Sequence, residues 1–144
     1  MSNFHPYIVH FPVALLTFSL LFELLARLRK NEMFSRVGWW SQLAGTIGLA
    51  SAVATGLITV RKVHIALIAK PYVDMHQQIA FIVTATFAVL FLWRISSKSR
   101  IPERYAALYL IILFVSTIAL WAGAGYGGEL VYRFGVGIRG LKAF

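Results

Sequence analysis

The stretch VGWWSQLAGTIGLASAVATGLITV, residues 37–60, decides the fold of this chain. It carries no charged residue, and Gly, Ala and Ser recur along it. Three similar stretches without Asp, Glu, Lys or Arg surround it, at residues 1–22, 75–93 and 105–128. A helix needs about 20 mainly apolar residues to cross the hydrocarbon core of a bilayer. Each stretch therefore predicts one membrane-spanning helix.

The composition of the whole chain agrees with this assignment. Of its 144 residues, 59% are hydrophobic and only 13% are charged, whereas soluble domains average about 25% charged residues. We predict an all-α integral membrane protein, a four-helix bundle with up-down topology. Residues 1–144 form a single transmembrane domain, and we expect a short glycine-rich tail at 125–144. The four helices are expected at residues 6–28, 38–60, 75–95 and 104–124.

The basic residues predict the orientation of the bundle. Of the 14 Lys and Arg residues, eight flank the first and third connections and six flank the second connection and the tail. By the positive-inside rule this bias favours both termini outside, N-out and C-out. The N-terminus lacks the basic region and cleavage site of a removable signal peptide. Because the basic residues are split between two faces, they favour contact with anionic lipid of the bilayer and argue against a nucleic-acid partner.

The small residues of the second helix predict close helix packing. Gly45, Gly48 and Gly56 let neighbouring backbones approach, which in lipid replaces the hydrophobic driving force between helices. This packing takes place either within the monomer or across a homodimer, and the pattern leaves both arrangements open.

Four histidines are the candidate site residues: His5, His10, His64 and His76. The expected topology gathers all four at the outer face. His10 lies roughly 6 Å inside the first helix, where an ionisable group is a functional hypothesis by default. The first and third helices are diagonal in an up-down bundle, so we expect His10 and His76 to be the axial ligands of a non-covalent b-type haem. His5 and His64 either support these ligands or bind a second haem.

The other diagonal is expected to make room for the macrocycle. Gly56 on the second helix and Gly123 and Gly125 on the fourth lie at about the depth of the histidines. Simple helix packing or capping is the alternative explanation for each glycine. Arg61 and Arg133 are candidate partners of the haem propionates at the water boundary.

Three acidic residues have expected partners. Asp74 and Glu129 are candidates to orient an axial imidazole through its second nitrogen. Glu23, near the inner end of the first helix, is expected to pair with Arg27 one turn away.

The chain contains no cysteine, which excludes covalent c-type haem and iron–sulfur ligation by thiolates. A zinc or copper ion bound by the four histidines and Glu129 is the rival to haem. No tight metal-ligand spacing such as H-x-x-H occurs, which weakens this rival.

Two motifs resemble a bacterial membrane family known as domain of unknown function 2231. They are HPYIVHFPVA at residues 5–14 and GGELVYRFGVG at residues 127–137, and the resemblance covers nearly the whole chain. It implies a four-helix domain in the bacterial cytoplasmic membrane. In that family the domain can stand beside Rieske-type or cytochrome c modules, which implies redox work at the outer face. The matching positions are His5, His10, His76 and the Gly-Gly-Glu segment at 127–129, and His64 matches no motif of the family.

These observations lead to one functional expectation and one alternative. We expect a b-type haem protein that transfers electrons at the periplasmic face, between quinone or a membrane complex and a cytochrome c or Rieske-type partner. An electron-transfer component fits better than a stand-alone enzyme. The alternative is a non-catalytic membrane subunit, or a module that binds a metal ion with the same histidines.

Overall fold

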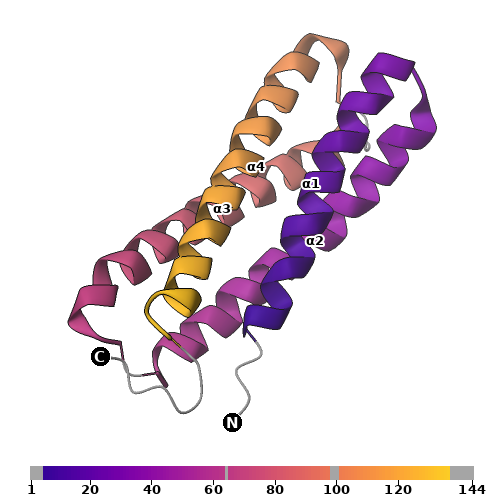
Figure 1. Cartoon of the computed structure of the whole chain (residues 1–144). Coiled ribbons are helices and arrows are strands. Elements are labelled where there is room, and N and C mark those ends of the chain that lie inside the picture. Colours follow the sequence, from indigo (N-terminus) through magenta and orange to yellow (C-terminus); the bar gives the residue numbers. More distant parts are fainter. Residues whose placement is uncertain (1–4, 64, 98–100, 137–144) are drawn as a thin grey trace.

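The computed structural model describes residues 5–63, 65–97 and 101–136, and four long helices make up most of them (Figure 1). Each helix, the third together with the short 3-10 turn η1 before it, is long and apolar enough to cross a membrane. The predicted all-α bundle of four spanning helices is therefore confirmed. The helices are α1 (His5–Arg29), α2 (Glu32–Val60), α3 (Lys70–Ser96) and α4 (Glu103–Tyr132), and η1 covers Leu67–Ala69.

The four helices form two antiparallel hairpins that pack side by side. α1 packs mainly on α2, and α3 packs mainly on α4. Contacts of α1 with α4 and of α2 with α3 join the hairpins less extensively, so α1 lies diagonal to α3. Figure 1 shows α1 and α2 running together from the turn that joins them.

The two ends of the bundle are called the histidine end and the arginine end. The histidine end holds the start of α1, the α2–α3 connection and the end of α4. The arginine end holds the turn between α1 and α2, the end of α3 and the start of α4. At this turn Lys30 has a φ of 48°, and the Asn31 side chain accepts a hydrogen bond of 2.8 Å from the Met33 N–H. This cap starts α2 at Glu32, six residues before the predicted boundary.

The fourth helix is longer than the sequence predicts. It continues through Gly123, Gly125 and Gly127 to Tyr132, so residues 125–132 are helical and do not belong to a tail. Glycine in a helix interior costs about 1 kcal/mol relative to alanine. Packing overrides this cost, because Leu130 is buried in a small cluster with Ala69 and Val73 at the histidine end.

The apolar residues divide between a narrow core and a wide outer surface. The core includes Leu16, Phe87 and Leu113, which are fully buried. Many large apolar side chains instead point outward, which suits helices surrounded by lipid. Among them are Phe18, Ile47, Ile82, Val89, Ile111, Phe114 and Val115.

The small residues of α2 pack against α1 within the same chain. A Cβ atom added at Gly45 would lie 2.7 Å from Leu16 Cγ, and one added at Gly48 would lie 3.4 Å from Pro12 Cδ. The absence of a side chain at Gly45 thus lets the Leu16 side chain fill the space. The glycines of α2 serve packing inside the monomer.

Candidate functional site

His5 and His76 meet across the diagonal at the histidine end. Their ring centroids are 6.4 Å apart and their planes make an angle of 78°. His5 is the first residue of α1, and His76 lies in the second turn of α3. Both side chains are half-buried. The pair links two helices that otherwise contact each other little.

Hydrogen bonds hold both rings through Nδ1. The Nδ1 atom of His76 lies 2.8 Å from the Gly123 carbonyl oxygen. Because a carbonyl only accepts, His76 Nδ1 must carry the proton. His5 Nδ1 lies 3.2 Å from Thr55 Oγ1, and that hydroxyl donates to backbone carbonyls of its own helix. The bond to Gly123 therefore leaves Nε2 as the basic nitrogen of His76, and the Thr55 hydroxyl, which already donates within its own helix, favours a protonated Nδ1 on His5.

Two glycines leave the space that the rings occupy. A Cβ atom added at Gly56 would lie 3.0 Å from His5 Cε1, and one added at Gly127 would lie 3.1 Å from His76 Cε1. Gly123 packs on Ile79, at 2.9 Å from an added Cβ, and supplies the carbonyl for His76. Gly125 faces outward with nothing within 4 Å of an added Cβ. Of the predicted glycines, Gly56 and Gly123 thus reach the pair and Gly125 does not.

An apolar cavity of about 140 Å³ lies beside the histidine pair. All four helices contribute to its walls, and aliphatic side chains dominate them. The wall residues include Val9, Val13, Leu49, Val83, Leu120 and Val131.

His10 does not face His76. It is exposed on the outer surface of α1, beside Tyr7 and Phe11. Five residues correspond to about 500° of rotation, so two histidines at this spacing point about 140° apart. When His5 points inward, His10 must point out. The expected pairing of His10 with His76 is therefore replaced by His5 with His76, and His64 lies outside the described residues.

The charged residues expected to assist the imidazoles lie on the exposed surface of the histidine end. Arg61 and Arg133 are exposed, as is Asp74. Glu129 is 3.6 Å from Arg133 in an exposed i, i+4 pair. The Gly123 carbonyl and the Thr55 hydroxyl therefore take the orienting role expected of Asp74 and Glu129. In the described part of the chain no group of three His, Asp or Glu residues is placed to hold a metal ion.

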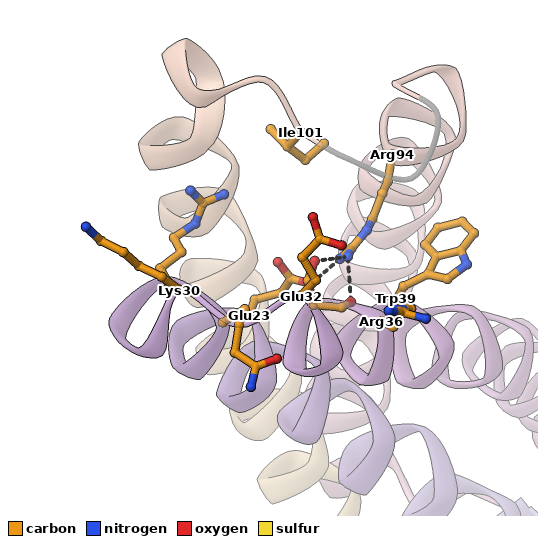
Figure 2. A pocket seen from close by; sticks show the side chains of 11 residues that line it. Glu23, Lys30, Glu32, Arg36, Trp39, Arg94 and Ile101 are labelled. Atoms are coloured by element: carbon orange, nitrogen blue, oxygen red, sulfur yellow. Dashed lines mark hydrogen bonds and ion pairs between the residues drawn. The ribbon is translucent and has the colours of Figure 1, made fainter.

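A second buried polar cluster lies at the arginine end (Figure 2). Arg94 of α3 donates to the carboxylate of Glu23 on α1, and both side chains are almost fully buried. Arg94 also donates to the Ser35 carbonyl at 2.8 Å and to its hydroxyl at 3.0 Å. Its guanidinium lies over the Trp39 ring, 5.5 Å from the centroid. Glu23 thus pairs across the bundle, and the expected pairing with Arg27 is replaced.

Sequence reasoning missed Arg94, because it treated this residue as a charge flanking a connection. The spacing of Arg94 from His76 along the sequence indicates that the two residues lie on the same face of their helix. His5 and Glu23 are separated by about five helical turns, and so are His76 and Arg94, which places each pair on one face of its helix. The same spacing separates Gly56 from Gly38 on α2, and an added Cβ at Gly38 would lie 2.7 Å from Glu23 Oε1.

The two polar clusters are therefore separated by about 27 Å along the helices. This length is close to the roughly 30 Å of the hydrocarbon core. Between them lies the apolar core around Leu16, Phe87 and Leu113. Each diagonal contact of α1 with α3 marks one boundary of the apolar zone.

Fold and site together define a small four-helix membrane protein with a histidine pair at one end and a buried ion pair at the other. The chain belongs to the family described as predicted membrane protein, DUF2231, which matches residues 1–140. No curated protein and no solved structure matches it.

Proposed function

We propose that this protein is a membrane-bound b-type haem protein, with His5 and His76 as the axial ligands. The separation of the two rings carries the proposal. With metal–nitrogen bonds of about 2 Å, two imidazoles on opposite sides of one metal have ring centres about 6 Å apart. The centroids of His5 and His76 are 6.4 Å apart.

The tautomers of the two histidines support the same role. A ligating histidine usually donates its other N–H to a carbonyl, a carboxylate or water, which fixes the ring and raises its basicity. His76 makes this bond to the Gly123 carbonyl, and His5 makes it to Thr55. Two neutral nitrogen ligands and no thiolate are typical of a b-type haem.

The two-hairpin architecture supplies a place for a planar macrocycle. His5 belongs to one hairpin and His76 to the other, and the hairpins contact each other less extensively than the helices within them do. The cavity of about 140 Å³ is smaller than the roughly 300–1,000 Å³ of ligand pockets. Haem binding therefore requires the apolar walls of this cavity to open while His5 and His76 keep their present separation. Gly56 and Gly127 would then face the macrocycle with backbone alone.

When bound, the haem supplies one-electron chemistry. The chain orients the imidazoles and surrounds them with aliphatic side chains that exclude water. Arg61 and Arg133, exposed at the same end, are available to the propionates. With this end at the periplasmic face of a bacterial inner membrane, electrons pass between quinone or a membrane complex and a redox protein of cytochrome c or Rieske type.

The haem content of the purified protein tests this proposal. We expect protein from haem-supplied cells to contain iron and extractable porphyrin in equal amounts, about one haem per chain. Iron without porphyrin, zinc or copper in its place, or no metal at all would overturn it.

A non-catalytic membrane subunit is the second candidate, and the position of His10 favours it. Tyr7 and Phe11, which flank His10 on the outer surface, are 76% and 72% exposed. An ionisable side chain within a span is costly when it faces lipid and usually faces protein instead. A partner helix over this face would cover it. The His10→Leu variant should then lose a co-purifying subunit, and unchanged co-purification would exclude this role for His10.

A further inference from the structure

An open cleft of about 620 Å³ lies at the arginine end. It is formed by the end of α1, the start of α2 and the end of α3, with Ile101 before α4 closing one side. The Glu23–Arg94 ion pair lies along its floor, next to Ser35 (Figure 2). The cleft is separate from the histidine pair, which lies about 27 Å away along the helices.

The side chains that line the cleft give it a positive charge. Arg27, Lys30 and Arg36 are exposed cations in its wall. Glu23 is neutralised by Arg94, so Glu32 is the remaining carboxylate among the lining residues. Three cations thus face one carboxylate. Figure 2 shows Lys30 and Arg36 on opposite sides, with the guanidinium of Arg94 between them.

The position of the cleft along the helices indicates that its positive charge lies at the level of the lipid headgroups. The ion pair lies about 27 Å from the histidine pair, so the two clusters mark the two boundaries of a hydrocarbon core of roughly 30 Å. Lipid phosphates lie just beyond such a boundary. Basic pockets between membrane helices are suited to anionic headgroups, and guanidinium groups pair well with phosphate oxygens. The volume of the cleft falls in the roughly 300–1,000 Å³ range of ligand sites.

We propose that this cleft binds a phosphate anion, supplied by the headgroup of an anionic phospholipid. Arg27, Lys30 and Arg36 provide the charge that attracts the phosphate. The Glu23–Arg94 pair fixes the floor and keeps α1 and α3 at a constant separation beneath it. Trp39, which packs against Arg94, places an aromatic ring at the membrane boundary, where such rings are enriched. This site does not depend on haem binding.

The test compares the binding of different lipids to the purified protein in a neutral detergent. Phosphatidylglycerol, phosphatidylcholine and inorganic phosphate are titrated separately, with lipid retention measured by native mass spectrometry and Tm measured in parallel. We expect phosphatidylglycerol to be retained and to raise the Tm, and phosphatidylcholine to do neither. In the cleft variant, Arg27→Gln with Lys30→Gln and Arg36→Gln, the apparent affinity should fall about 100-fold.

The matched control removes the same charge from exposed positions outside the cleft and the histidine site, with Lys62→Gln, Lys70→Gln and Arg104→Gln. It should bind phosphatidylglycerol as the natural chain does. Single variants Lys30→Gln and Arg36→Gln should each weaken binding about fivefold, which keeps the test valid if the triple variant fails to fold. If inorganic phosphate raises the Tm of the natural chain and of the control but not of the cleft variant, the result supports the anion site and assigns it to a soluble phosphate. Equal losses in cleft and control variants, or no preference for phosphatidylglycerol, would overturn the proposal.

Discussion

At the scale of single residues, the histidine site depends on two glycines, Gly56 and Gly127, which leave room for the imidazoles because they have no side chain. An added Cβ at Gly127 would lie 3.1 Å from His76 Cε1, a distance at which the imidazole must move. At Gly125, two residues away on the same helix, an added Cβ meets nothing within 4 Å. A comparison of Gly125 with Gly127 therefore distinguishes the general cost of glycine in a helix from the packing of Gly127 against His76.

Alanine substitution should affect the stability of the protein differently at these two glycines. Gly125→Ala should raise the free energy of unfolding by up to about 1 kcal/mol, because alanine is the better helix former. Gly127→Ala should raise the free energy of unfolding by less than Gly125→Ala does, or should lower it, because the new Cβ atom displaces the His76 ring. Thermal unfolding in detergent measures both. Equal stabilisation by the two substitutions would show that His76 does not pack on Gly127.

The buried Glu23–Arg94 ion pair should contribute more to stability than the exposed Glu129–Arg133 pair. Glu23→Ala should lower the free energy of unfolding by about 3–5 kcal/mol, because it leaves the Arg94 charge buried without its partner. The double variant Glu23→Leu with Arg94→Leu should cost less than Glu23→Ala alone. Glu129→Ala is the control, since Glu129 is exposed in its pair with Arg133 and should change stability by less than about 1 kcal/mol. Equal effects of Glu23→Ala and Glu129→Ala would contradict the buried pair.

At the scale of elements, the contact of α1 with α2 depends on where the glycines of α2 lie. An added Cβ at Gly45 would lie 2.7 Å from Leu16, which is fully buried, whereas one at Gly48 would make ordinary contact with Pro12 at 3.4 Å. Gly45→Ala should therefore destabilise by about 1–3 kcal/mol through overpacking. Gly48→Ala should be neutral or stabilising. Chemical unfolding in mixed micelles distinguishes them, and a neutral Gly45→Ala would contradict the packing of α2 on α1.

The helices and their order could be predicted from the sequence, because uncharged stretches of spanning length leave few alternatives in a bilayer. The end of α4 could not, because local helix propensity assigns its glycines to a tail, while packing against α3 keeps them helical. The sequence places His76 and Gly56 at the same end of the bundle but does not give the side on which each residue of α1 lies. His76 and Gly56 are where the sequence suggests, but depth alone favours His10 over His5. Only the rotation of α1, fixed by Leu16 and Glu23 facing inward, selects His5.

At the scale of the whole molecule, the protein is a two-ended bundle. Its diagonal helices α1 and α3 touch through a histidine pair at one end and through Glu23 and Arg94 at the other. Within the described residues the histidine pair lies at one end of the bundle, so the proposed haem would lie at one face of the membrane. The arginine end joins the two hairpins through Glu23 and Arg94, and its cleft is the proposed anion site.

This arrangement leads to a prediction about ligand-linked stability. Because haem would join the two hairpins at the histidine end, the haem-loaded protein should have a higher Tm than the haem-free protein. The increase should be lost in His5→Ala and retained in His10→Ala. A Tm that does not depend on haem would contradict the placement of haem between the hairpins.

The reduced-minus-oxidised absorption spectrum of three variants purified from haem-supplied cells tests whether His5 and His76 hold a haem. His5→Ala and His76→Ala should lose the Soret and α-band differences of a haem with two histidine ligands. His10→Ala, changed on the same helix but on its outer surface, should keep the spectrum of the natural chain. A spectrum that survives in His5→Ala but disappears in His10→Ala would show that His10, and not His5, holds the haem.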